Sequence, residues 1–296
     1  MGKSHHVNEP GVWTARGAWV LMPFTVGPCL ARALDPTSSP FRTTASVLLW
    51  AGWAVALGAA LVPRTISLTI VRTAMPAGLV AAGWAALALP GGSPAWVPAL
   101  GVGWALVAVA ACLSPLLGDT FVNGSAYGPE RRMALRVPGA LLVLAPVTWA
   151  VAVAGAGAGP LLLAARVWVP GAVALVAGWP LAFVAVRALH GLSRRWVVFV
   201  PAGVVLHDLF GMPDAVLFPR RMIAHLGPAP VGVEALDATQ RAPGLALLLE
   251  LTEPLPIGVR EGRQEVGTVD TVRLLFTPTR PGALLAEAEA RRIRVD

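Results

Sequence analysis

Residues 161–186 read LLLAARVWVPGAVALVAGWPLAFVAV, an apolar run in which Arg166 is the only charged side chain. A helix that crosses a bilayer needs about 20 consecutive apolar residues, so this run predicts a membrane-spanning helix. Arg187 ends the run, and residues 195–201 (RWVVFVP) are rich in the β-branched and aromatic residues that favour a strand. The fold therefore changes after residue 187, from transmembrane helices to a β-rich domain over residues 193–296.

Earlier apolar runs extend the transmembrane domain over residues 1–187. We expect clear spans at residues 44–62, 73–89, 96–117, 138–155 and 161–186. An earlier segment, residues 17–31, is short and is interrupted by Pro23 and Pro28, so it could span, dip into the bilayer and return, or lie in the interface. No clean small-x-small cleavage site follows it, which favours a retained segment over a signal peptide. The bundle thus has five or six helices.

Composition supports the membrane assignment and excludes nucleic acid as a partner. The chain is 56% hydrophobic and 13% charged, whereas a soluble protein carries about 25% charged residues. The net charge of +7 comes entirely from residues 1–187, because arginines and acids balance in residues 188–296. An arginine excess confined to the membrane half is what the positive-inside bias produces. The Ala, Gly, Val, Pro and Arg content is typical of bacteria with GC-rich genomes.

The placement of arginine predicts the topology in a bacterial plasma membrane. Basic residues occur in segments 63–72 and 118–137 and after residue 187, whereas the loops at 90–95 and 155–160 carry no charge. This alternation places the basic segments and the C-terminal domain in the cytoplasm. The N-terminus lies inside with six spans and outside with five. Arg32 and Arg42 then fall on the outer side, as an exception to the pattern.

The C-terminal domain combines short strands with one terminal helix. Strands are expected at residues 195–201 and 204–208, which form a hairpin around Ala202–Gly203, and at 214–219, 221–227, 245–252 and 271–276. Residues 281–293 follow with one apolar helical face. This order, with the phrases Phe276–Pro278 and Phe218–Gly227, resembles the bacterial pleckstrin-homology-like (PH-like) domains. His225 and Leu226 depart from the family pattern.

The resemblance covers residues 193–293 and implies a bent antiparallel β-barrel or sandwich with a C-terminal helix. It implies no catalytic residues, and relatives of such domains bind lipid headgroups, peptides or their own membrane segments. The sequence also lacks nucleotide-binding, hydrolase and metal-ligand motifs, so we expect no cofactor, no metal and no enzymatic activity. No Asp or Glu lies between Thr43 and Gly118, which argues against proton- or cation-coupled transport.

Arginines are the remaining candidates for a binding site. Arg72 precedes the second span, and Arg166 lies about six residues inside the last, roughly 9 Å from its end, where it anchors the helix by snorkelling or binds an anion. Others could contact anionic headgroups. The candidate lipid or anion contacts are Arg72, Arg131, Arg132, Arg136, Arg166, Arg194, Arg195, Arg220 and Arg221.

Two functions follow from these residues. The first is a non-enzymatic membrane scaffold or regulator, whose cytoplasmic PH-like domain docks a partner protein or the inner leaflet. The alternative is a transporter or channel component for a lipid or an anionic solute, for which Arg166, the glycine run 155–159 and the proline-broken helices are the relevant features. The same glycine run predicts close helix packing, within the chain or between copies.

Overall fold

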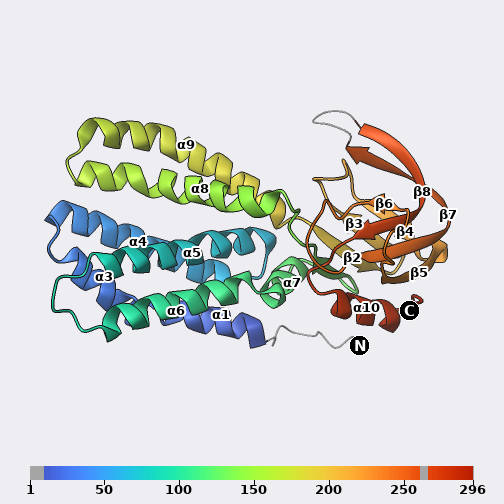
Figure 1. Cartoon of the computed structure of the whole chain (residues 1–296), viewed down its shortest axis with the longest axis horizontal. Helices are drawn as coiled ribbons and strands as arrows, with labels where there is room; N and C mark the ends of the chain where they lie inside the picture. The colour runs from blue at the N-terminus through green and yellow to red at the C-terminus, as the bar shows by residue number, and fades with distance from the viewer. Residues whose placement is uncertain (1–9, 261–265, 296) are drawn as a thin grey trace. The chain divides into compact units, whose positions relative to one another are not determined.

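A computed structural model describes residues 10–260 and 266–295 (Figure 1). The chain forms two compact units, and neither is continuous in sequence. We call residues 1–121 and 146–190 the helical unit, and residues 122–145 and 191–296 the β unit. Residues 122–145 therefore group with the C-terminal domain, whereas the sequence placed them in a transmembrane domain over residues 1–187.

Long apolar helices make up most of the helical unit. They are α4 (Ser39–Leu61), α5 (Thr65–Leu87), α6 (Trp96–Leu113), α8 (Leu141–Ala164) and α9 (Trp168–Leu192). By length and composition, all five can cross a membrane. The prediction of a multi-pass membrane protein is confirmed at this level, although the helices begin or end up to nine residues from the expected positions.

The N-terminal segment is helical but broken. It forms α1 (Pro10–Val20), α2 (Met22–Thr25) and α3 (Gly27–Leu34), which pack against α4, α5 and α6. Proline has no backbone N–H, so Pro23 cannot bond to the carbonyl oxygen of Trp19. The indole of Trp53 in α4 donates to that oxygen instead, at 2.9 Å. A neighbouring helix thus satisfies a carbonyl that proline leaves free, as membrane helices require.

Small residues are frequent among the buried positions of the long helices, and several large apolar side chains face outward. Buried positions include Ala56, Ala82 and Ala105, whereas Val176 is 75% exposed and Phe183 is 69% exposed. Further tryptophans also bond between helices, since Trp104 donates to the carbonyl oxygen of Ala18 and Trp149 to that of Thr73. This arrangement suits a hydrocarbon solvent, in which helices associate through close packing and polar contacts.

The structure corrects the expected loop at residues 155–160. These residues lie inside α8, and the turn between α8 and α9 comes later, at residues 165–167. A Cβ atom on Gly155 would lie 2.4 Å from the carbonyl oxygen of Gly178, so α8 and α9 touch backbone to backbone. The glycine run therefore makes a helix contact within one chain.

Two sheets form the body of the β unit. The first has the order β1-β2-β3-β4, built from Arg131–Ala134, Trp196–Val200, Gly203–His207 and Val216–Pro219. The second has the order β5-β7-β8-β6, built from Ile223–Pro228, Leu247–Arg260, Val266–Phe276 and Leu236–Asp237. A short 3-10 helix, η1 (Arg220–Met222), precedes β5, and α10 (Pro281–Ala290) follows β8.

The predicted hairpin is confirmed, because Trp196 pairs with His207 and Val200 with Gly203. Of the barrel or sandwich that was expected, the described strands form no closed barrel but two separate four-stranded sheets. Strand β1 was not expected, and it comes from the segment between α7 (Pro115–Asn123) and α8. Strand β6 was also not expected, and its pairing with β8 is parallel.

Large side chains fill the core of the β unit. Phe199, Phe218 and Phe276 are fully or almost fully buried, and Leu284 and Ala288 of α10 join them. Fully burying side chains of this size stabilises a fold by about 1.5–3 kcal/mol each. The β unit therefore has the packed apolar core of a water-soluble domain, closed on one side by its C-terminal helix.

Candidate functional site

Arg72 lies within α5, whereas the sequence predicted that it precedes this helix. It follows Thr65 by seven residues, which is roughly 10 Å along the helix axis. Its Nε donates to the carbonyl oxygen of Cys112 at 3.3 Å, in the last turn of α6. Because the last carbonyls of a helix lack partners within it, this arginine caps α6. A Cβ atom on Gly118 would lie 2.9 Å from its Nη2, so the absence of a side chain there makes room for the guanidinium.

Arg166 lies in the turn between α8 and α9, and the prediction that it sits inside a helix is wrong. The residue is exposed and has a φ of 62°. Non-glycine residues rarely adopt this left-handed conformation, which here reverses the chain without a glycine. An arginine at a helix end needs no partner in the hydrocarbon, because its guanidinium reaches the polar region directly.

Arg195 forms a buried ion pair in the β unit. Its Nε lies 2.7 Å from Oδ1 of Asp208 and its Nη2 lies 2.5 Å from Oδ2, with 2% and 0% of the two side chains exposed. The remaining terminal nitrogen donates to the carbonyl oxygen of Arg136, and the amide of Gln240 donates to Asp208. This two-pronged, buried contact neutralises Arg195, which therefore stabilises the β unit from inside.

Asp208 is adjacent to His207 in sequence, but the two side chains contact different residues. Asp208 pairs with Arg195, while the ring of His207 stacks on Trp196 with centroids 4.5 Å apart. His207 Nδ1 also lies 2.8 Å from the carbonyl oxygen of Arg194. In the observed hairpin, Trp196 pairs with His207, so residue 195 lies opposite residue 208.

The arginines near β1 have defined contacts too. Arg132 pairs with Glu130 at 3.1 Å, and its guanidinium lies 5.7 Å from the ring centroid of Trp196. Arg131 and Arg136 are half-buried, and a Cβ atom on Gly244 would lie 2.8 Å from Nε of Arg136. Arg194, in contrast, is exposed. Cation–π and ion-pair contacts of this kind hold Arg132 against the sheet.

The structure joins two basic clusters that lie far apart in sequence. Arg220 of η1 donates to the carbonyl oxygen of Arg291, at the end of α10. Arg291 itself pairs with Glu287 at 2.6 Å and donates to the carbonyl oxygen of Pro129. We call this group the C-terminal arginine cluster, and its members are Arg220, Arg221, Arg291, Arg292 and Arg294.

Four members of the cluster are exposed, and three of them have no carboxylate partner among the described residues. Arg220, Arg221 and Arg292 are exposed, and none has a carboxylate partner within residues 10–260 and 266–295. Arginine binds carboxylates and phosphates through a planar fork of N–H donors. The cluster can therefore hold anionic groups, whether these belong to a lipid or to a protein.

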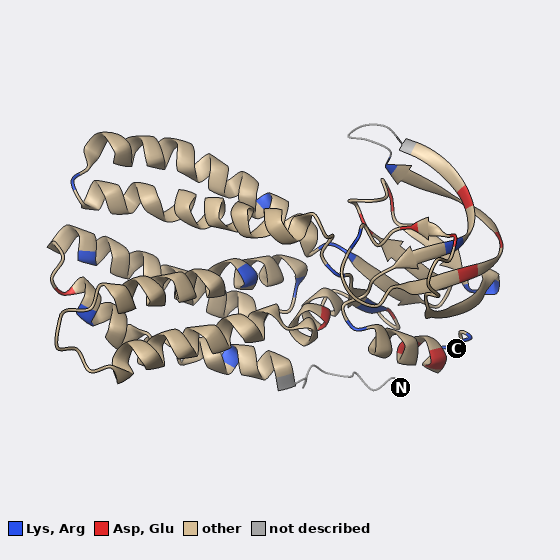
Figure 2. Ribbon diagram, in the orientation of Figure 1, with Lys and Arg blue, Asp and Glu red and all other residues tan. Residues whose placement is uncertain are grey.

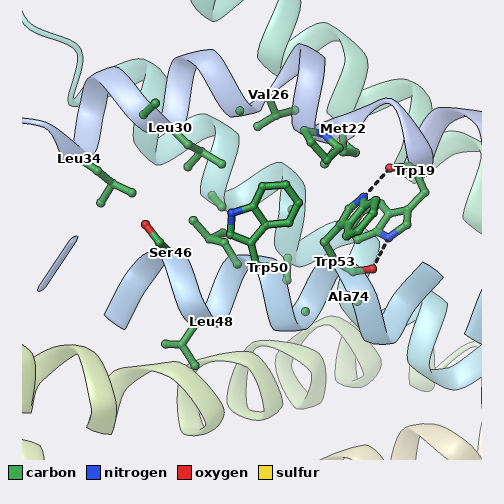
Figure 3. Close-up of a pocket in the computed structure, with 18 residues that line it drawn as sticks. Trp19, Met22, Val26, Leu30, Leu34, Ser46, Leu48, Trp50, Trp53 and Ala74 are labelled. Atoms are coloured by element: carbon green, nitrogen blue, oxygen red, sulfur yellow. Dashed lines mark hydrogen bonds between the residues drawn. The ribbon is translucent and has the colours of Figure 1, made fainter. Parts of the chain in front are cut away.

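The helical unit contains a cavity of about 430 Å³. Residues from the α1–α3 segment, from α4 and from α5 line it, and Trp19, Trp50 and Trp53 are its largest side chains (Figure 3). Arg166 is not among the lining residues. The cavity is thus apolar, whereas the transport hypothesis requires a polar path lined by Arg166.

The described residues offer exposed arginines and apolar surface for binding. The part of the chain that the structure describes holds no group of three His, Cys, Asp or Glu residues able to bind a metal ion. Figure 2 shows charged residues spread over the β unit and sparse in the helical unit. No protein-family model matches the chain, and no curated protein or solved structure is significantly similar to it.

Proposed function

We propose that this chain is a non-enzymatic integral membrane protein of a bacterial plasma membrane, with a scaffolding or regulatory role. Its β unit lies in the cytoplasm, has a PH-like fold, and docks an anionic surface of a partner protein or of the inner leaflet. The C-terminal arginine cluster carries this proposal. It presents Arg220, Arg221 and Arg292 without carboxylate partners within the described ranges.

Charge and anchoring act together in this proposal. Each basic residue near an anionic membrane surface contributes about 1 kcal/mol of attraction. The membrane helices hold the β unit close to the bilayer, so weak contacts are strengthened by high effective concentration. The two packed sheets and the terminal helix support the PH-like assignment. They also form a rigid body on which the cluster is held.

A lipid nanodisc experiment tests the docking role on the full chain. We expect slower hydrogen exchange in peptides covering residues 220–228 and 288–295 when the nanodisc contains phosphatidylglycerol than when it contains phosphatidylcholine alone. Combined Arg220→Gln, Arg221→Gln and Arg292→Gln substitution should abolish this difference. Arg241→Gln with Arg260→Gln is the control, because both arginines are exposed and lie outside the cluster.

Two results would separate the docking partners. Lipid-dependent protection that the cluster variant removes supports docking on the inner leaflet. Protection that is the same in both lipids, together with arginine-dependent crosslinking to one protein in native cells, supports a protein partner. An unchanged cellular phenotype and unchanged protection in the cluster variant would contradict the proposal. Reporter fusions at the C-terminus test its cytoplasmic location independently.

A further inference from the structure

The floor of the cavity in the helical unit is made by small residues of α5. Ala74, Ala77, Gly78 and Ala81 follow the i, i+3, i+4, i+7 spacing that places side chains on one helix face. Large residues on this face would fill the space between α5 and the α1–α3 segment. The sequence of α5 thus leaves a cavity there.

The walls of the cavity include two glycines with open space beside them. Gly27 of α3 and Gly52 of α4 both line it, and a Cβ atom on either would meet nothing within 4 Å. Gly78 of α5, in contrast, has no free space beside it, because a Cβ atom there would lie 2.9 Å from the Met22 side chain. The N-terminal segment therefore touches α5 near Gly78 and leaves room near Gly27 and Gly52.

The two ends of the cavity differ in chemistry. At one end, Trp19 and Trp53 exchange hydrogen bonds, each indole donating to the other residue's carbonyl oxygen at 2.9 Å. At the other end lie Leu34 and Ser46, with Trp50 between the two ends (Figure 3). Arg42 precedes Ser46 by one helical turn, on the face of α4 that also carries Trp50 and Trp53. The Ser46 end therefore leads to a positive charge.

That end carries more than one arginine. Arg42 pairs with Asp35 at 3.4 Å, and the two side chains are 45% and 82% exposed. Arg32 is also exposed, and its side chain donates only to the carbonyl oxygen of Pro28, so it has no carboxylate partner among the described residues. An exposed ion pair contributes little to stability, so Arg42 is free to exchange Asp35 for another anion.

We infer that this cavity holds one hydrocarbon chain of an anionic phospholipid, whose phosphate lies beside Arg42 and Arg32. Charge complementarity identifies the occupant, because a phosphate fits an arginine pair and a hydrocarbon chain fits the apolar lining. The dimensions agree as well. Eleven residues separate Arg42 from Trp53, about 16 Å along α4, and one leaflet contributes half of the roughly 30 Å hydrocarbon layer.

This site explains why two arginines lie on the predicted outer side of the membrane. Arg32 and Arg42 lie at the opposite end of α4 from Arg64, and they were the exception to the predicted positive-inside pattern. Binding a lipid phosphate gives them a role that is independent of topology. The inference concerns the helical unit alone and goes beyond the docking role proposed for the β unit.

Native mass spectrometry of the full chain in mild detergent tests the site, with phosphatidylglycerol and phosphatidylcholine of equal chain length as probes. We expect tighter retention of phosphatidylglycerol. Gly52→Leu fills the cavity and should weaken binding of both lipids about tenfold. Gly58→Leu is the matched control, since it lies on the same helix, a Cβ atom there meets nothing within 4 Å, and it does not line the cavity.

A second pair of variants tests the headgroup. Arg42→Gln should weaken phosphatidylglycerol about fivefold and phosphatidylcholine less, because one arginine near an anionic surface contributes about 1 kcal/mol and the choline cation offsets the phosphate charge. Arg64→Gln, at the other end of α4, should behave as the unmodified chain. Equal retention of the two lipids, full retention by Gly52→Leu, or occupancy by detergent or by a second copy of the chain would each overturn the inference.

Discussion

The helical unit and the β unit differ in which residues they bury. In the helical unit, alanine supplies many of the buried positions while Phe183 and Val176 face outward. In the β unit, Phe199 and Phe276 are buried, and the described charged residues other than Arg195 and Asp208 are exposed or half-buried. Water drives large apolar side chains inward, whereas hydrocarbon does not distinguish a leucine from a lipid tail. The solvent of each unit thus decides what its interior contains.

Polar contacts follow the same division. The helical unit uses single hydrogen bonds from indoles and arginines to backbone carbonyls, such as Trp53 to Trp19 and Arg72 to Cys112. The β unit buries a complete ion pair, Arg195 with Asp208. Removing one partner of the buried ion pair should therefore destabilise its unit more than removing one of the single hydrogen bonds. The following substitutions test this difference, from the largest expected effect to the smallest.

Asp208→Asn should have the largest effect. It leaves the buried guanidinium of Arg195 without its counter-charge, and breaking such a pair costs about 3–5 kcal/mol. We expect loss of hydrogen-exchange protection in β2 and β3 of the full chain in mild detergent, with α8 and α9 unaffected. A variant with unchanged protection in both strands would show that Arg195 is not neutralised by Asp208.

Gly155→Leu should separate α8 from α9. The added side chain would collide with the backbone of Gly178, and overpacking of this kind costs about 1–3 kcal/mol. The measurements are the thermal midpoint in mild detergent and the distance between spin labels on the two helices. Gly157→Leu is the control, because a Cβ atom there meets nothing within 4 Å. Equal effects of both substitutions would contradict the close contact.

Trp53→Phe should have a smaller effect, since it removes one hydrogen bond and keeps an aromatic ring. Polar contacts between membrane helices contribute about 0.6 kcal/mol on average and at most about 1.7. The carbonyl of Trp19 then lacks the donor that replaces the missing N–H of Pro23. Trp50→Phe, on the same helix and without such a bond, should leave the unfolding free energy in detergent unchanged.

Local sequence features predicted most of the elements. Apolar length identified all the long helices, and the turn signal near Ala202–Gly203 identified the hairpin, whose turn lies one residue earlier, at residues 201–202. Strand β1 could not be found in this way, because RRMA is short and becomes a strand only by pairing with β2, more than sixty residues later. The turn at Arg166 was missed for a related reason, since no Gly or Pro marks it.

The candidate residues were harder to assign than the fold. Arginine type and position identified a cationic surface, but burial separated Arg195 from exposed Arg221. Only the tertiary structure brings Arg220 beside Arg291, because the two belong to different elements of the β unit. The spacing of small residues from Ala74 to Ala81 is the sequence feature that corresponds to the cavity. Such spacing is compatible with a cavity as well as with close helix packing.

Arg273→Gln should have the smallest effect and so calibrates the first prediction. Arg273 pairs with Glu250 across β7 and β8 at 2.9 Å, with 47% and 30% of the two side chains exposed. Water screens such a pair, which contributes about 0–1 kcal/mol. Hydrogen exchange of β7 and β8 should therefore change little, in contrast to β2 and β3 in Asp208→Asn. A loss as large as that of Asp208→Asn would mean that burial does not determine which ion pair the β unit depends on.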